Sequence, residues 1–120
     1  MAMQSFAGIA ALTVFAVSCG AAHAQQGVSG IGAQRCAILN ARATAASNQS
    51  DTTALTSWIE GFISGLNMNA ENDFFYDLAS VPADQQQAQI LAYCRNHPSD
   101  PVMNAALHMA QNALPRKPVQ

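Results

Sequence analysis

Apolar residues recur at helical spacing along most of this chain, and the alternating patterns typical of strands are scarce. The clearest helix follows Asp51, which we expect to cap it by accepting hydrogen bonds from the first-turn amides. Six apolar positions at i, i+3, i+4, i+7, i+8 and i+11 then form one stripe, and the helix should end near Asn67–Asn72. The six residues are Leu55, Trp58, Ile59, Phe62, Ile63 and Leu66.

Two glycines, Gly61 and Gly65, form a line of small residues beside this stripe. A glycine costs a helix about 1 kcal/mol relative to alanine. Their presence at this spacing therefore predicts that the backbone of another helix packs closely against them.

Weaker patterns predict a helix on each side of this one. The first runs from about Gly30 to Ala46, with a start that is weakened by glycines. Its apolar positions are Ile31, Ala33, Cys36, Ile38 and Leu39. The other starts around Pro82, a favourable residue for a first turn, and ends at Asn96, before Pro98. We expect its inward residues to be Ala88, Leu91 and either Tyr93 or Cys94.

A final helix is predicted after Asp100, which would act as its cap, with Pro101 at its first position. Its stripe contains mainly alanine, and its members are Val102, Ala105, Ala106, Met109, Ala110 and Ala113. Pro115 and Pro118 should end the helix and leave a frayed tail.

Three consecutive aromatic residues, Phe74, Phe75 and Tyr76, interrupt the helical pattern between residues 71 and 81. A helix could not bury all three on one face, so we expect a loop or a short helical turn. Its aromatic rings would either cover the core or form an exposed patch that binds another protein. The predicted fold is therefore all-α, a small bundle of about four helices.

The N-terminal sequence has an uncharged apolar run from Phe6 to Val17, followed by an A-x-A sequence that ends at Ala24. This pattern is typical of a secretory signal peptide, and the run is shorter than the roughly 20 apolar residues of a membrane-spanning helix. We predict that residues 1–24 are a signal peptide and that residues 25–120 form a single periplasmic or secreted domain. A retained anchor and lipidation of Cys19 remain alternatives.

Cleavage would remove Cys19 and leave Cys36 and Cys94, an even number of cysteines in an exported protein. Disulfides persist in oxidising compartments, so we predict that these two residues form one. The chain-entropy model predicts that such a bridge adds about 4 kcal/mol to the free energy of unfolding. Two buried free thiols, or a metal site that uses Cys94 and His97, are the alternatives.

Charged residues make up 10% of the chain and the net charge is −2, without clustering. This composition disfavours binding to nucleic acid or to an anionic membrane surface, both of which need a basic face. Candidate catalytic residues are isolated: Glu60 and Asp77 form no recognised pair, and His97 and His108 have no evident nucleophile beside them. Metalloprotease, phosphate-loop and nucleophile-elbow motifs are absent from the sequence. We therefore predict a protein that is not an enzyme and needs no cofactor or metal.

Three features together resemble a known family: Cys36 in the first helix, the stretch WIEGFISG from Trp58 to Gly65, and the stretch YCRNHP from Tyr93 to Pro98. With the final helix, they are similar to periplasmic proteins of the HdeA/HdeB type, over about residues 33–114. Small periplasmic immunity proteins that guard against type VI secretion effectors share a similar outline.

The chaperone resemblance implies that low pH loosens a folded dimer and exposes apolar surface, which then holds unfolded clients. Below about pH 3 the carboxylates are neutral, and the mature chain would carry a charge near +8 from five Lys and Arg, two His and the amine. Repulsion of this size loosens a small fold. The exposed protein-binding residues would be Trp58, Phe62, Phe74, Phe75 and Tyr76.

The immunity-protein resemblance implies instead a domain that stays folded at neutral pH and blocks one effector enzyme. A periplasmic structural or assembly factor is a third possibility. In all three cases the expected partners are other proteins, with a homodimer possible and with neither nucleic acid nor stable membrane insertion after signal cleavage.

Overall fold

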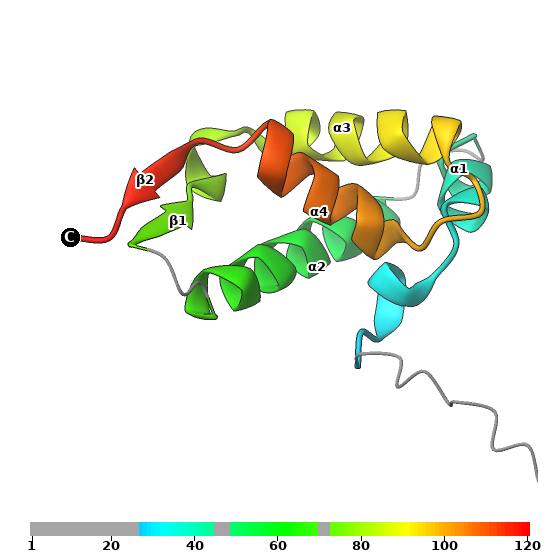
Figure 1. Ribbon diagram of the computed structural model, residues 1–120. Helices are drawn as coiled ribbons and strands as arrows, with labels where there is room; N and C mark the ends of the chain where they lie inside the picture. Colours follow the sequence, from blue (N-terminus) through cyan, green and yellow to red (C-terminus); the bar gives the residue numbers. More distant parts are fainter. Residues whose placement is uncertain (1–26, 45–48, 70–72) are drawn as a thin grey trace, which may run out of the picture.

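The computed structural model describes residues 27–44, 49–69 and 73–120, and the predicted signal peptide with Cys19 lies outside these ranges (Figure 1). The described chain is a small helical bundle, as the sequence predicted. Its elements in chain order are η1 (Gly30–Ala33), α1 (Cys36–Thr44), α2 (Gln49–Met68), β1 (Phe74–Tyr76), η2 (Leu78–Ser80), α3 (Ala83–Asn96), α4 (Val102–Asn112) and β2 (Arg116–Pro118). The two η elements are short 3₁₀ helices.

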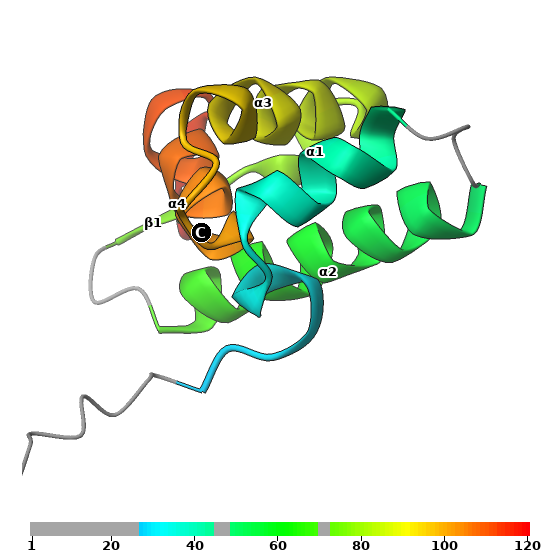
Figure 2. The same cartoon turned by 90° about the vertical axis from the view of Figure 1, so that its right-hand side faces the viewer.

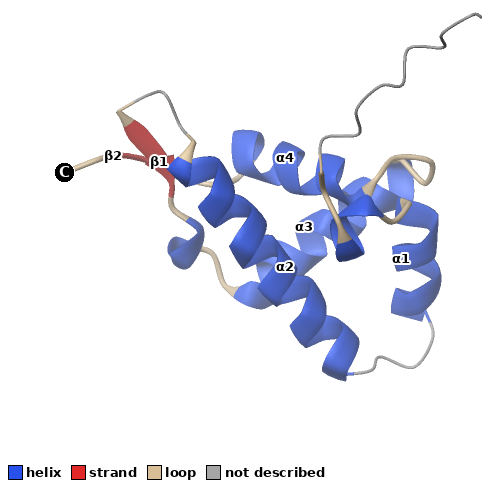
Figure 3. Ribbon diagram, turned by 90° about the horizontal axis from the view of Figure 1, so that it is seen from below, coloured by secondary structure: helices blue, strands red, loops and turns tan. Residues whose placement is uncertain are grey.

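The four α-helices pack around one core, with α4 between α2 and α3 (Figure 1). Helix α1 lies at one end, beside the C-terminal part of α3 (Figure 2). Strands β1 and β2 form an antiparallel ribbon at the opposite end, next to the C-terminus of α2 (Figure 3). The domain therefore has an α1 end and a ribbon end.

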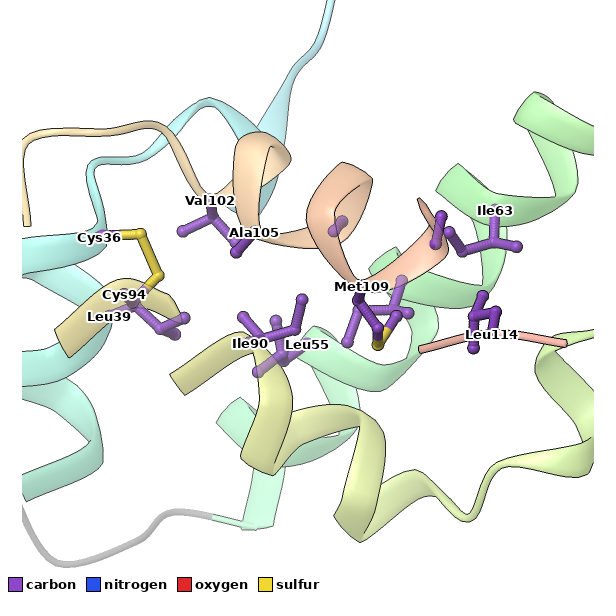
Figure 4. Packing of buried hydrophobic residues seen from close by; sticks show 13 residues of the cluster. Cys36, Leu39, Leu55, Ile63, Ile90, Cys94, Val102, Ala105, Met109 and Leu114 are labelled. Carbon is purple, nitrogen blue, oxygen red and sulfur yellow. A yellow bond between two sulfur atoms is a disulfide. The ribbon is translucent and has the colours of Figure 1, made fainter. Parts of the chain in front are cut away.

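A disulfide between Cys36 and Cys94 fixes the α1 end, which confirms the predicted pairing (Figure 4). Both cysteines are fully buried. Backbone amides strengthen the same junction: those of Cys36 and Ala37 donate to the carbonyls of Asp100 (2.8 Å) and Pro98 (2.9 Å). The start of α1 is thus joined to the α3–α4 corner by covalent and hydrogen bonds together.

The predicted stripes of α2 and α4 form most of the core (Figure 4). On α2, Leu55, Ile59 and Ile63 are buried, and the other three stripe residues are half-buried. On α4, the first five stripe residues are buried and Ala113 is half-buried. Both helices therefore bury the faces that their apolar spacing predicted.

Helix α3 buries the expected face only in part: Cys94 is buried and Leu91 is half-buried against the core, as predicted. Ala88 is exposed, whereas Gln86, Ile90 and Cys94 are buried at i, i+4 and i+8. Gln86 can lie inside because its Nε2 donates to the carbonyl of Val81 at 2.7 Å. This hydrogen bond offsets part of the cost of burying the amide.

The first predicted helix is divided in two. Gln34 is extended, with φ −73° and ψ 150°, and it separates η1 from α1. Arg35 then forms an isolated bridge with Pro101, which is incompatible with a continuous helix. Of the expected apolar positions, Ala33 and Ile38 are exposed, Ile38 by 44%.

Both predicted aspartate caps are wrong. Helix α2 begins at Gln49, so Asp51 lies within its first turn, where a negative charge still favours the helix dipole. Pro101 takes the N-cap position of α4, which has no side-chain cap. The Asp100 carboxylate instead accepts a hydrogen bond from the Tyr93 hydroxyl at 2.7 Å.

The expected packing role of Gly61 and Gly65 is also wrong within this chain. A Cβ atom built at either position meets nothing within 4 Å in the described structure. Gly61 is exposed and Gly65 is half-buried. The close approach occurs at Gly32, where a Cβ would lie 1.8 Å from Cζ2 of Trp58.

The C-terminal tail is a strand rather than a frayed end. Strand β2 pairs with β1 in the register Phe74↔Pro118, Phe75↔Lys117 and Tyr76↔Arg116. Hydrogen bonds continue on both sides, from the amide of Asp77 to the Pro115 carbonyl (2.8 Å) and from that of Val119 to the Asp73 carbonyl (2.9 Å). The aromatic run is therefore strand β1, where a loop or helical turn was expected.

Candidate protein-binding surface

The five aromatic residues predicted to bind proteins fall into two groups. Trp58 and Phe62 stack on α2 with ring centroids 5.0 Å apart. Phe74 and Tyr76 meet edge to face on β1, at 5.8 Å. No ring of one group contacts a ring of the other among the residues that the structure describes. All five are half-buried, so they cover part of the domain and keep part of their apolar surface exposed.

The α2 group is held by the glycine turn before α1. Gly32 is buried and its Cα faces the indole of Trp58, while Gly30 adopts φ +68°, a conformation that favours glycine. Trp58 and Phe62 both pack on the buried core. This group therefore belongs mainly to the structural core of the domain.

The β1 group has two faces, because successive strand residues point to opposite sides. The Arg116 guanidinium lies over the ring of Phe74 at 4.7 Å and over that of Tyr76 at 5.7 Å. Such cation–π contacts are worth about 0.5–1 kcal/mol each at exposed sites. On the other face, Phe75 lies between two surface hollows. The Arg116 side chain of β2 thus covers the rings on one face of β1.

The side chain of Asn67 completes the free edge of β1. Its Nδ2 donates to the Tyr76 carbonyl at 3.0 Å, and its Oδ1 accepts from the Tyr76 amide at 2.8 Å. These two bonds imitate the pairing of another strand. One side chain therefore satisfies both backbone polar groups of Tyr76.

An ion pair between Lys117 and Asp77 fastens β2 to the start of η2. Asp77 is only 8% exposed. The hydrogen bond from Lys117 lowers the pKa of Asp77 below its usual value, and this effect outweighs burial, which acts in the opposite direction. The ion pair therefore stabilises the fold fully above the unfolded pKa of about 4 and is lost as the pH falls through the lower folded pKa.

A second cluster, which the sequence did not suggest, surrounds Tyr93 at the α3–α4 corner. Its ring stacks on that of His97 at 4.1 Å and touches that of His108 at 5.2 Å. The hydrogen bond to Asp100 raises the pKa of Tyr93, and burial and the negative charge of Asp100 add to this shift. The two histidines that sequence analysis treated as isolated thus share one aromatic neighbour.

A small apolar hollow of about 80 Å³ opens between α1, α2 and α3. Buried or half-buried aliphatic side chains form its walls, and Arg42 and Asp51 are at its rim. The hollow is smaller than the 150 Å³ cavity that holds a benzene molecule, so it has room for one small aliphatic group. Its aliphatic walls are Ile31, Leu39, Leu55 and Leu91.

No group of three His, Cys, Asp or Glu residues within the described ranges is arranged to hold a metal ion. Glu60 and Asp77 do line a common hollow, together with Gln86. In the same ranges, none of the helices has the length and apolar character to cross a membrane. Comparison with protein-family models, with curated proteins and with solved structures gives no match to this chain.

Proposed function

We propose that this protein is a periplasmic, non-enzymatic, protein-binding domain that acts as a holdase in acid. The disulfide is compatible with an oxidising compartment, and the predicted signal peptide supports export. The observation that carries the proposal is the ion pair between Lys117 and Asp77, which fastens a short strand beside the half-buried aromatic residues of β1.

Acid acts on this ribbon in two ways. Protonation of Asp77 breaks the ion pair, and the loss of the other carboxylate charges leaves a strongly positive chain that repels itself. Strand β2 has only three residues and all three are exposed, so few buried contacts keep it in place. Its release would remove Arg116 from the rings of Phe74 and Tyr76 and make these rings more accessible to unfolded clients.

The α1 end should resist the same change. The disulfide and the two backbone hydrogen bonds that join the start of α1 to the α3–α4 corner involve no ionisable side chain. The loosened chain would therefore stay tethered, with an open ribbon end and a linked α1 end. Such a state binds clients reversibly because neutralisation restores the ion pair.

The test is light scattering of an acid-sensitive client at about pH 2–3 and about pH 7, on either side of the carboxylate titration. Circular dichroism in the near and far ultraviolet is recorded on the same samples. Suppressed aggregation only in acid, with loss of the near-ultraviolet signal, is expected. No protection, with the tertiary signal unchanged, would overturn the proposal and favour a fixed surface for one partner at neutral pH.

A matched pair of variants links the activity to the ribbon. Asp77→Asn removes the ion pair at every pH, so the dye ANS should bind this variant at a higher pH than it binds the wild type. Asp84→Asn makes the same change of charge at an exposed position on α3 and should behave as the wild type. Equal ANS profiles for the two variants would show that the ion pair does not control exposure.

A further inference from the structure

The apolar hollow between α1, α2 and α3 has two opposite charges at its rim. Arg42 is in the last turn of α1 and Asp51 is in the first turn of α2, so the two charges come from different helices. Both residues are exposed. Lys117 and Asp77 form the only ion pair among the residues that the structure describes, so Arg42 and Asp51 pair neither with each other nor with another described residue. A ligand at this rim would therefore meet one free cation and one free anion.

The interior of the hollow matches a short aliphatic side chain. Its aliphatic walls are Leu39 and Leu55, which are buried, and Ile31 and Leu91, which are half-buried. An apolar space that stays unfilled lacks the dispersion contacts that a branched alkyl group would make with these walls. Apolar walls with a few polar groups at the mouth are also the usual composition of a small-molecule site.

Gln87 adds an open hydrogen-bond acceptor to the same hollow. The residue is half-buried, and its Nε2 donates to Thr56 Oγ1 at 2.6 Å and to the Thr52 carbonyl at 3.4 Å, which fixes the orientation of the amide. Its Oε1 has no hydrogen-bond partner within the described chain. This atom differs from the Oε1 of Gln86 because it is not among the fully buried atoms without a partner. A donor on a bound ligand could therefore reach it.

We propose that this hollow binds a free amino acid with a short aliphatic side chain, such as leucine or valine. The side chain would fill the hollow, and the carboxylate would accept hydrogen bonds from the Arg42 guanidinium, whose planar fork suits a carboxylate. The ammonium group would pair with Asp51 and donate to Gln87 Oε1. A free amino acid joins these three groups at one carbon atom, so it matches a small apolar hollow with both charges at its mouth. This proposal concerns the folded protein at neutral pH and does not depend on the holdase proposal.

The experiment is a titration of the ¹⁵N-labelled oxidised protein with L-leucine at neutral pH and low salt, followed by NMR. We expect saturable shifts of the backbone amides of Ala43 and Thr52, which line the hollow, and of the Gln87 side-chain amide. The affinity should be in the millimolar range, as expected for so small a ligand. Glycine has both charges but no side chain, so it should bind at least about tenfold more weakly because it buries no apolar surface in the hollow.

Helix α3 provides a matched control for each charge at the rim. Arg42 and Arg95 are both exposed arginines in the last turn of a helix, and Asp51 and Asp84 are both exposed aspartates in a first turn. Only the first residue of each pair lines the hollow. We expect Arg42→Gln and Asp51→Asn each to weaken leucine binding about threefold or more, and Arg95→Gln and Asp84→Asn to change it less than about 1.5-fold. Equal effects within either pair, or no saturable shift around the hollow in the wild type, would overturn the proposal.

Two leucine derivatives test whether both charges of the ligand are read. N-acetyl-leucine lacks the ammonium charge and leucinamide lacks the carboxylate, so each should bind at least about threefold more weakly than leucine. N-acetyl-leucine that bound as tightly as leucine would instead indicate the carboxyl-terminal residue of a partner chain. Leucinamide that bound as tightly would indicate an amino-terminal residue. Either result would overturn the assignment to a free amino acid, as would glycine that bound as tightly as leucine.

Discussion

The contact between Gly32 and Trp58 gives the sharpest test of how this domain is packed. In the variant Gly32→Ala, the new methyl group would lie 1.8 Å from Cζ2 and 2.5 Å from Cε2 of the indole. The ring cannot turn away easily, because it packs on the core and stacks on Phe62. Either the indole or the η1 backbone must therefore move.

The expected loss follows from two opposing effects. Overpacking of this kind costs about 1–3 kcal/mol. Replacing glycine with alanine restricts the unfolded chain and returns about 0.4–1 kcal/mol. We expect a net loss of about 1–2 kcal/mol in the free energy of unfolding by urea, which lowers the Tm by roughly 5–10 °C in a domain of this size.

The control is Gly61→Ala, where a Cβ meets open space on an exposed helix face. Alanine is the better helix former, so this variant should gain about 0.5–1 kcal/mol. The two substitutions are chemically identical and should have opposite signs. A loss at Gly61 would contradict the open space around this position.

A double-mutant cycle identifies the indole as the cause. In a Trp58→Leu background, the added cost of Gly32→Ala should largely disappear, with a coupling energy of about 1 kcal/mol or more. If Gly32→Ala is neutral in the wild type, or equally costly in both backgrounds, the reasoning from this contact fails.

Three further predictions concern the core, the disulfide and the α3–α4 corner. Ile59→Ala should cost about 2–5 kcal/mol because the side chain is fully buried, whereas Ile38→Ala, at a residue 44% exposed, should stay within about 0.5 kcal/mol in the same urea titration. Reduction of the disulfide, which closes a loop of 58 positions, should lower the free energy of unfolding by about 4 kcal/mol, measured as the difference between oxidised and reduced samples. The hydrogen bond that raises the pKa of Tyr93 stabilises the fold below the unfolded pKa of about 10 and is lost as the pH rises through the higher folded pKa. Tyr93→Phe should therefore reduce the loss of stability between about pH 9 and 12, and an unchanged alkaline profile would contradict this origin.

The sequence predicted the helices that bury regular apolar stripes. On α2 and α4, the spacing of apolar residues indicates the buried face directly, since each helix buries residues of its stripe over two or more turns. On α3 the same reasoning found Leu91 and Cys94 but missed Gln86, because hydropathy does not show that Val81 supplies an acceptor for this amide. A satisfied polar residue inside a core has no signature in the sequence.

Pairing between distant segments was the other feature that the sequence did not reveal. Strands β1 and β2 have three residues each and are separated by α3 and α4. Segments this short show no clear alternation, and the prolines of the tail suggested a break. The need for glycine at position 32 was missed for a similar reason. It arises from contact with Trp58, which follows Gly32 by 26 residues and so lies beyond any local pattern.

Among the predicted binding residues, the structure separates two roles that the sequence could not distinguish. Trp58 and Phe62 pack on the core beneath η1, so substituting them should affect stability first. Phe74 and Phe75 lie on the ribbon and are not part of that packing, so their loss should affect binding with less effect on folding. The sequence grouped all five aromatic residues as one surface, because residue type alone does not show which of them pack on the core.

The proposed mechanism depends on the different ways in which the two ends of the domain are held together. At the ribbon end, the ion pair between Lys117 and Asp77 fastens a strand of three exposed residues. At the α1 end, a disulfide and two backbone hydrogen bonds join α1 to the α3–α4 corner. Acid removes the charge of Asp77 but does not break the disulfide. The ribbon end should therefore open in acid while the α1 end stays linked.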